Sequence, residues 1–390
     1  MSFTPSGADH VSAGAAIPPL VSVVMANFRG APHLAAAMAS VLGQTETRLE
    51  LILADDASDD DSVAIARGIA QGDDRVRVIA SPRNSGPAAT RNLALDAAQG
   101  TWIAVVDSDD LIHPARLARL IAAAEAADAD IVADDLVYFG AVAEPNGRSL
   151  LQSLALSAPM TLTPALYLRS NDAAAALPHF GYLKPLIRRE VLAARRYDPT
   201  LRIGEDFDLV MRLLLEGARF LLLPDPLYAY RRHAGSISHR LSVDTVAAML
   251  AAHRALPPMP DPETRAAAAA VDRQLRLSLR YETLVADIKA RHWRGALPRL
   301  ADPAMILRLV ESLRDRRRHR AAQAGALPDA ALPSPIPDMP ASGSPWSLPP
   351  APVAAAVAAR AARDEGPPPQ APAWTHWLAA ATTAGQKRAG

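Results

Sequence analysis

Apolar and polar positions alternate with two different periods along the first third of the chain. Short apolar runs predict strands at residues 20–26, 49–55, 75–80 and 101–107. Between them, apolar positions at helical spacing predict helices near 33–42, 62–69 and 87–98. Strands separated by helices favour right-handed crossovers and a mostly parallel sheet. We therefore predict an α/β fold, with a mostly parallel central sheet flanked by helices.

The pattern changes twice after this region. It becomes less regular from about residue 140 to 240, with a helix near 205–216, and helices follow near 243–255 and over 271–290. The last 70 residues hold 13 of the 34 prolines, which is typical of disordered segments. The predicted units are a flexible leader, the α/β domain, a helical extension and a mostly disordered Pro/Ala-rich tail, at residues 1–18, 19–240, 241–322 and 323–390.

Composition excludes several classes of protein. Lysine plus arginine equals aspartate plus glutamate, at 41 each, so net charge gives no reason to expect a nucleic-acid partner. The absence of cysteine excludes disulfides, thiolate metal sites and a cysteine nucleophile. No apolar stretch is long enough to predict a membrane span, so we expect a soluble or peripheral protein. The basic run 314–320 is expected to be a solvated helix end, with contact to anionic lipid heads as the alternative.

Carboxylates follow the fourth predicted strand in VVDSDD (105–110). Ligands of such sheets bind beyond the carboxyl ends of the strands, and side chains at i and i+2 of an extended chain point the same way. One interpretation is a polar turn that uses Asp110 or His113 to cap the helix near Pro114. It leaves unexplained the like charges of Asp107 and Asp109, which predict a Mg²⁺ or Mn²⁺ ion shared with substrate phosphates.

Three further sets of residues are candidates for chemistry. Asp56 follows the second strand, where a carboxylate can accept the ring N–H of a pyrimidine, while a capped turn accounts for residues 58–61. Arg91 lies one helical turn after Pro87, either exposed or on a nucleotide. Glu205 and Asp206 begin a helix, where acidic residues are common, and either can serve as a catalytic base.

Several motifs occur together in one order: PLVSVVMANF (19–28), ASVLGQT (39–45), LILADDASDD (51–60), SGPAATRNLAL (85–95), QGTWIAVVDSDD (99–110) and GEDFDLVMRLL (204–214). In these motifs the chain resembles the family-2 glycosyltransferases, whose fold is the nucleotide-diphospho-sugar transferase (GT-A) fold. The resemblance covers roughly residues 19–240. The stretch DADIVADDLVYF (128–139) resembles bacterial exopolysaccharide transferases of the succinoglycan type.

The resemblance implies roles for individual positions. It places the base of the nucleotide against Ala26 and Phe28. At the position of Phe28 the family usually has tyrosine. The stacking face is retained and the hydroxyl is lost, for which Asn27 can compensate if the strand aims it correctly. It makes Asp206 the catalytic base, with Glu205 either orienting Asp206 or contacting the acceptor. The other implied contacts are Asp56 to uracil, Arg91 to the nucleotide, Ser108 to the nucleotide sugar, and Asp107 and Asp109 to the metal and diphosphate. Arg231 and His233 either neutralise the leaving diphosphate, with His233 as an alternative metal ligand, or only hold a loop in place.

The expected function is that of an inverting, metal-dependent glycosyltransferase. It would move a sugar from a nucleotide diphosphate, UDP first, to a glycan or lipid-linked acceptor in bacterial surface polysaccharide biosynthesis. The expected place is the cytoplasm, peripherally at the inner face of the plasma membrane. A non-catalytic sugar-nucleotide-binding or scaffolding protein is the alternative. A nucleotidyltransferase would need a glycine-rich basic phosphate loop, which MANFRGAPH (25–33) does not provide.

Overall fold

The computed structural model describes residues 19–140, 147–232, 241–310, 312 and 314, so the predicted leader and tail lie outside the described residues. The strands are β1 (Val21–Asn27), β2 (Leu49–Asp55), β3 (Val76–Ala80), β4 (Trp102–Val105), β5 (Leu111–Ile112), β6 (Ile131–Gly140), β7 (Met160–Leu162), β8 (Leu186–Arg188) and β9 (Phe220–Arg232). The α-helices are α1 (Ala31–Leu42), α2 (Ser62–Ala70), α3 (Pro87–Ala97), α4 (Arg116–Ala126), α5 (Pro164–Arg169), α6 (Arg189–Leu192), α7 (Glu205–Leu215), α8 (Val243–Arg254), α9 (Pro262–Lys289) and α10 (Trp293–Leu300). Short 3₁₀ helices are η1 (Gln152–Leu154), η2 (Ala173–Ala175) and η3 (Phe180–Tyr182).

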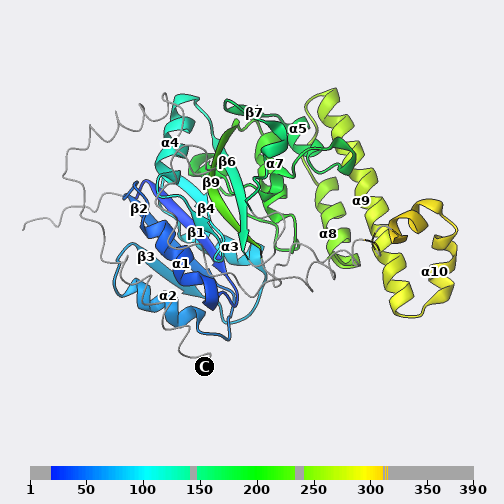
Figure 1. Cartoon of the computed structure of the whole chain (residues 1–390), viewed down its shortest axis with the longest axis horizontal. Helices are drawn as coiled ribbons and strands as arrows, with labels where there is room; N and C mark the ends of the chain where they lie inside the picture. Colours follow the sequence, from blue (N-terminus) through cyan, green and yellow to red (C-terminus); the bar gives the residue numbers. More distant parts are fainter. Residues whose placement is uncertain (1–18, 141–146, 233–240, 311, 313, 315–390) are drawn as a thin grey trace, which may run out of the picture.

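The described strands form one sheet in the order β3-β2-β1-β4-β8-β6-β9-β5, with β7 paired to β9 (Figure 1). The first four strands pair in parallel, as predicted, and β6 also runs parallel to β9. The sheet becomes mixed at β8, which runs antiparallel to both β4 and β6. At three residues, β8 is too short to show a period in the sequence.

The two faces of the sheet carry two separate apolar cores, because side chains alternate along each strand. Val21, Val23 and Met25 of β1 pack with apolar residues of α1, α2 and α4. Val24 points to the opposite face and belongs to the core formed with α3, α5 and α7. Both faces are therefore covered by helices, which leaves the ends of the strands as the place for polar side chains.

The parallel register brings strand ends together at one edge. Asn27 pairs with Asp55 at the ends of β1 and β2, and β4 ends at Val105, just before the VVDSDD aspartates. The turn that leads into β4 fits closely against β1. A Cβ on Gly100 would lie 2.4 Å from the backbone nitrogen of Ser22. This close approach fixes β4, and hence the turn after it, relative to β1.

Residues 241–310 are helical for most of their length, as predicted, and extend away from the sheet (Figure 1). The long helix α9 begins at the N-cap Asp261, whose carboxylate accepts the backbone N–H of Thr264 at 2.8 Å. Its first half packs on the sheet domain through Ala267 and Val271. Its second half forms a small core of its own, in which Leu284 packs with residues of α10 and of the helical segment 303–310.

Candidate functional site

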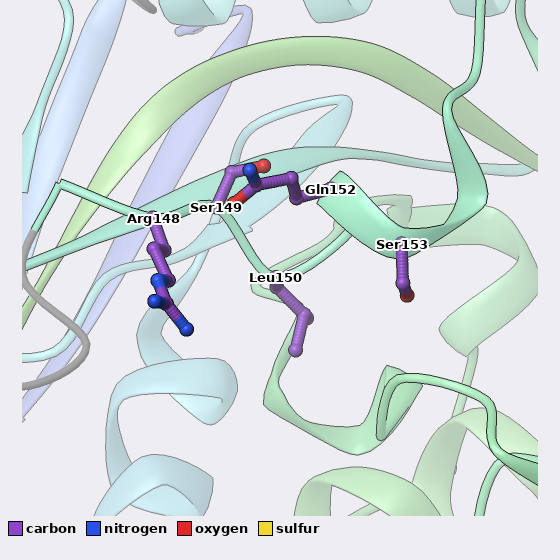
Figure 2. A pocket seen from close by; sticks show the side chains of 5 residues that line it. All are labelled: Arg148, Ser149, Leu150, Gln152 and Ser153. Atoms are coloured by element: carbon purple, nitrogen blue, oxygen red, sulfur yellow. The ribbon is translucent and has the colours of Figure 1, made fainter.

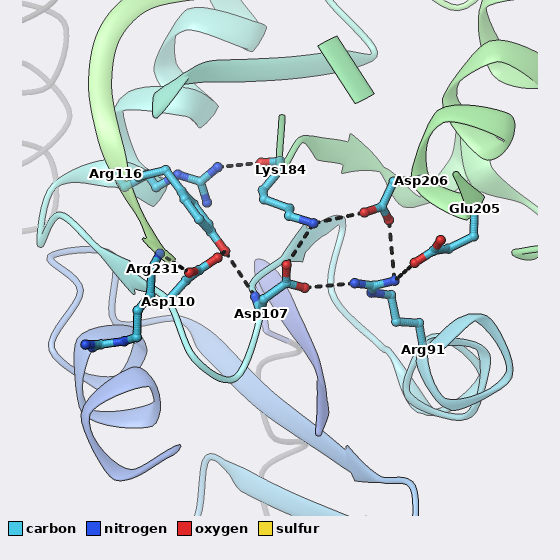
Figure 3. A network of polar contacts seen from close by, with 9 residues as sticks. Arg91, Asp107, Asp110, Arg116, Lys184, Glu205, Asp206 and Arg231 are labelled. Atoms are coloured by element: carbon cyan, nitrogen blue, oxygen red, sulfur yellow. Dashed lines mark hydrogen bonds and ion pairs between the residues drawn. The ribbon is translucent and has the colours of Figure 1, made fainter. Parts of the chain in front are cut away.

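Two basic and three acidic side chains meet beyond the end of β4 (Figure 3). Asp107 comes from the turn after β4, and Arg91 comes from the first half of α3. Glu205 and Asp206 are the first two residues of α7. Lys184 lies between η3 and β8. We call these five residues the ionic cluster; four of them were predicted as site residues, and the structure brings those four together.

Each of the two cations bridges Asp107 to the start of α7. Arg91 lies 2.8 Å from Asp107 Oδ1 and 2.6 Å from Glu205 Oε1. Lys184 Nζ lies 2.8 Å from Asp107 Oδ2 and 2.9 Å from Asp206 Oδ2. A longer ion pair of 3.7 Å joins Arg91 Nη1 to Asp206 Oδ1. The turn after β4 and the start of α7 are therefore held together by charge.

Burial makes these ion pairs strong and mutually dependent. The Arg91 and Lys184 side chains are 7% and 6% exposed. Burial raises the pKa of Asp107, but Lys184 and Arg91 outweigh it and hold that pKa below the ordinary value. Burial and the neighbouring Asp206 raise the pKa of Glu205. Burial lowers the pKa of Lys184, but Asp107 and Asp206 hold it well above the ordinary value. The cluster thus keeps Lys184 protonated and Asp107 ionised.

A second layer of buried residues supports the cluster. The guanidinium of Arg116 donates to both carboxylate oxygens of Asp134 and, at 2.5 Å, to the backbone oxygen of Lys184. It also lies 5.0 Å from the centre of the Tyr228 ring. The backbone N–H of Asp107 donates to the Tyr228 hydroxyl at 3.1 Å. Arg116 therefore holds the backbone of Lys184 directly and packs on Tyr228, which in turn binds the backbone of Asp107.

Asp110 points into the protein, so the capping role considered for it is wrong. Its carboxylate accepts the Tyr228 hydroxyl at 2.7 Å and the backbone N–H of Arg231 at 2.6 Å. Burial, with Asp109 and Asp107 nearby, raises the pKa of Asp110 well above the ordinary value. The other residue considered, His113, accepts the backbone N–H of Ala115, the N-cap of α4, at 3.1 Å.

Arg231 is tied to the same turn. Its Nε donates to the backbone oxygen of Asp109 at 2.6 Å, and its guanidinium packs 4.4 Å from the centre of the Phe139 ring. In Figure 3 the guanidinium points away from the ionic cluster. Its role toward a leaving diphosphate stays a prediction. His233 lies outside the described residues.

The residues expected around a base lie at the ends of β1 and β2. Phe28 follows β1 and is 42% exposed, while Ala26 is half-buried. Asn27 is buried, and its Nδ2 donates to Asp55 Oδ2 at 2.7 Å. Asp56 is buried as well: its two oxygens accept the backbone N–H groups of the Ser85–Gly86 turn before α3, at 2.7 and 2.9 Å. Only Phe28 offers an open surface here, and the roles of these residues stay predictions.

The carboxylates after β4 fit a hard divalent cation. The described residues contain no group of three or more histidine or acidic side chains placed to hold a metal. Mg²⁺ and Mn²⁺ commonly bind through one or two carboxylates plus substrate phosphates, however, and Asp107 and Asp109 supply two. An ionised carboxylate offers about four lone-pair sites, and Asp107 uses one on each oxygen for Arg91 and Lys184. The donor set therefore leaves room for an ion.

Sequence reasoning missed Lys184, although the sequence carries a signal for it. The chain has only three lysines, and this one stands in FGYLKPLIRR (180–189), among apolar residues just before a buried strand. A charged residue is almost never fully buried unless it is paired. A lysine in such a context therefore predicts a carboxylate partner, although the sequence does not say which one.

None of the predicted site residues lines the hollow of about 410 Å³ that Figure 2 shows. The segment that lines it runs beside β6, where the backbone N–H of Tyr138 donates to the oxygen of Arg148 at 3.0 Å. Its lining has one charged side chain and presents no acid, base or nucleophile in an arrangement for catalysis. Its lining residues are Arg148, Ser149, Leu150, Gln152 and Ser153. Among the described helices, none has the length and hydropathy needed to cross a membrane.

Comparisons with known proteins are consistent with this geometry. The family model described as glycosyl transferase family 2 matches residues 22–189. The succinoglycan biosynthesis protein ExoO of Rhizobium meliloti (strain 1021) is 36% identical over 318 residues, which cover 78% of this chain and 88% of that protein. The succinoglycan biosynthesis protein ExoU of the same organism is 34% identical over 233 residues, covering 58% of this chain and 66% of that protein.

A solved structure has the same fold. The crystal structure of residues 1–349 of S. aureus TarS in complex with UDP-GlcNAc matches 72% of this chain and 79% of that chain, with a TM-score of 0.56 and 20% identity. This likeness confirms the predicted GT-A type of fold.

Proposed function

The chain belongs to glycosyl transferase family 2, and from this membership we propose that it transfers a sugar from a nucleotide diphosphate to an acceptor hydroxyl. The observation that carries the proposal is the ionic cluster. In it, Lys184 lies 2.8 Å from Asp107, beside the expected diphosphate, and 2.9 Å from Asp206, the expected base. This closeness supports the proposal, because a displacement reaction requires the donor's diphosphate and the base to lie near one another.

The donor is proposed to lie along the ends of β1, β2 and β4. The exposed ring of Phe28 offers a stacking surface for a base. Asp56, Asn27 and Ala26 lie at the neighbouring ends of β1 and β2. UDP is preferred because the family pairs the residue at Asp56 with uracil. Because backbone N–H groups already bind the Asp56 carboxylate, a uracil contact would share those oxygens.

Asp109 and Asp107 are proposed to hold Mn²⁺ or Mg²⁺ together with the diphosphate. When bound, such an ion stabilises the negative charge that develops on the leaving diphosphate. Ser108 lies between these two residues, and its backbone and hydroxyl are proposed to contact the nucleotide sugar. Arg231 supports this turn through the backbone oxygen of Asp109.

Asp206 is proposed to act as the base in a single displacement that inverts the anomeric carbon. The acceptor oxygen forms the new bond to that carbon, the bond to the diphosphate oxygen breaks, and Asp206 takes the acceptor's proton. The N-cap of α7 is Gly204, which has left-handed backbone geometry, so neither Glu205 nor Asp206 occupies the capping position. Glu205 is proposed to hold Arg91 and so to orient the start of α7.

The proposed pathway is bacterial exopolysaccharide biosynthesis, with a glycan or lipid-linked acceptor. This pathway is supported by the similarity to the succinoglycan biosynthesis protein ExoO, which covers 88% of that protein. The proposed place is the cytoplasm, at the inner face of the plasma membrane. Exposed apolar side chains on α10 and on the segment 303–310 support peripheral contact with the membrane. Arg294, Arg299 and Arg308 of the same two helical stretches add positive charge.

The experiment that tests the function is hydrolysis of a panel of donors. Purified full-length protein is incubated with UDP-, GDP- and dTDP-sugars and Mn²⁺, and release of nucleoside diphosphate is measured. We expect slow hydrolysis of one or a few UDP-sugars, and loss of that activity in excess EDTA. Tight binding of a nucleotide sugar with no turnover in the presence of a lipid-linked acceptor would instead support the non-catalytic binding protein.

A further inference from the structure

Lys184 is the one member of the ionic cluster that makes a hydrogen bond to Asp206 among the described contacts (Figure 3). We infer that Lys184 is a positioning residue of the transfer reaction, which holds the carboxylate of Asp206 in the orientation that accepts the acceptor's proton. The inference rests on the proposed function and extends it to a residue outside the sequence motifs. It follows from the pairing of Arg91 with Glu205 and of Lys184 with Asp206 at the start of α7.

Arg91 and Lys184 serve different carboxylates. Arg91 Nη1 lies 2.6 Å from Glu205 but 3.7 Å from Asp206 Oδ1, which is beyond hydrogen-bond distance. Lys184 Nζ lies 2.9 Å from Asp206 Oδ2. The rotation of the Asp206 carboxylate is therefore set by Lys184. With Oδ2 held, Oδ1 is the oxygen left to take a proton.

Lys184 is itself held from several sides. Its side chain is 6% exposed, and its ammonium also bonds Asp107 Oδ2 at 2.8 Å. Its backbone oxygen accepts from Arg116, which is fully buried and paired with Asp134. Pro185 follows it, which restricts the backbone of Lys184 to extended conformations. A flexible side chain is thereby fixed at a single point between two carboxylates, as positioning requires.

Charge neutralisation alone does not account for this arrangement. Arg91 already lies near the carboxylates of Asp107, Glu205 and Asp206 and supplies a positive charge to all three. Its planar guanidinium spreads its donors over a wide fork, whereas an ammonium is a compact point charge. Only the compact group reaches one oxygen of Asp107 and one of Asp206 from a single nitrogen. Replacing Lys184 by arginine keeps the positive charge and loses this geometry. The variant therefore separates charge neutralisation from positioning.

The test measures donor hydrolysis and thermal unfolding for four full-length proteins: native, Lys184→Met, Lys184→Arg and the control Lys289→Met. Lys289 is an exposed lysine at the end of α9. For Lys184→Met we expect kcat to fall by about 10²-fold, the size of effect that misplacement of a reacting group produces. The donor KM should change far less, because Lys184 contacts carboxylates of the protein. Lys184→Arg should unfold like the native protein and still lose most of kcat.

A second measurement covers the case in which Lys184→Met unfolds, since breaking a buried ion pair is strongly destabilising. Lys184→Ala is assayed with added ethylamine or propylamine, whose ammonium can occupy the vacated position. Recovery of the kcat of Lys184→Ala that saturates with amine, with no effect of amine on the kcat of the Lys289→Met control, supports positioning. Native kcat in folded Lys184→Arg, or an unchanged kcat in folded Lys184→Met, overturns the inference. Failure of the native protein to hydrolyse any donor would instead count against the proposed function itself.

Discussion

At the scale of single residues, charge compensation decides what the site can do. Asp107 and Asp206 face one another across two buried cations, so neither carboxylate stands unpaired in a low-dielectric surrounding. By contrast, Phe28 is the exposed member of the candidate donor site. The charged side chains of the ionic cluster are thus already paired with one another, whereas the Phe28 side chain is open to contact with a ligand.

This difference predicts the effect of Phe28→Ala. Base–aromatic stacking is worth about 1–3 kcal/mol, so the variant should bind UDP roughly 5- to 150-fold more weakly. Its kcat should stay close to native, because Phe28 is outside the ionic cluster. Titration calorimetry with UDP and Mn²⁺ measures the change.

Phe28→Tyr keeps the ring and should keep the affinity, and Leu241→Ala, another exposed apolar residue, serves as the control. An unchanged dissociation constant for Phe28→Ala would show that the base binds elsewhere.

The site residues that could be predicted are those with a recognisable position along the chain. Asp107 follows an apolar strand, and Asp206 begins an amphipathic helix, so pattern and motif were enough to propose them. Lys184 escaped because its partners are far away in the sequence, across 77 residues for Asp107, and the strand after it is too short for a pattern. The inward turn of Asp110 escaped for the same reason, since its partners lie on β9.

At the scale of elements, the alternation of strands and helices predicted the first half of the sheet, where β1, β2, β3 and β4 follow one another with helical crossovers. The second half could not be predicted, because β8 inserts between β4 and β6 from a distant part of the chain. That insertion matters for the site, since Lys184 lies just before β8. Long-range pairing therefore delivers the residue that the local pattern missed.

The seating of β4 against β1 predicts the effect of Gly100→Ala. The new Cβ would lie 2.4 Å from the Ser22 nitrogen and 2.7 Å from the Val21 carbonyl carbon, so backbone has to move. Overpacking of this kind costs about 1–3 kcal/mol. Denaturant unfolding should show that loss of stability, with a parallel loss of activity because Asp107 lies in the turn after β4.

The matched control is Gly68→Ala in α2, where a Cβ meets nothing within 4 Å. Alanine there should stabilise the helix by about 0.5–1 kcal/mol. Equal stabilities for Gly100→Ala and the native protein would contradict the close contact between β1 and β4.

At the scale of the whole molecule, the sheet domain and the C-terminal helices differ in surface character. The end of the molecule formed by α10 and the helical segment 303–310 exposes apolar side chains, namely Trp293, Leu297, Ile306, Leu307 and Val310. Within residues 289–310, one lysine and four arginines stand against a single aspartate. Apolar and cationic side chains in combination are typical of surfaces that rest on anionic bilayers. The rest of the basic run 314–320, beyond Arg314, lies outside the described residues.

This surface predicts binding to anionic vesicles. The full-length protein should sediment with vesicles that contain phosphatidylglycerol, less so with pure phosphatidylcholine, and less again at high salt. Replacing both Trp293 and Leu297 by serine should weaken sedimentation, while Leu241→Ser should leave it unchanged. Equal sedimentation of the native protein and the double variant would show that α10 does not contact the bilayer.

The most direct test of the central claim, that this site transfers sugars with Asp206 as base, compares nucleoside diphosphate release by the native protein and Asp206→Asn. The amide keeps the volume of the side chain and cannot take a proton from the acceptor. A general base contributes about 10² to 10⁴ in rate, so the variant should lose at least 10²-fold in turnover. Its melting temperature and UDP affinity should stay near native. A folded variant that releases the diphosphate at the native rate would contradict the account.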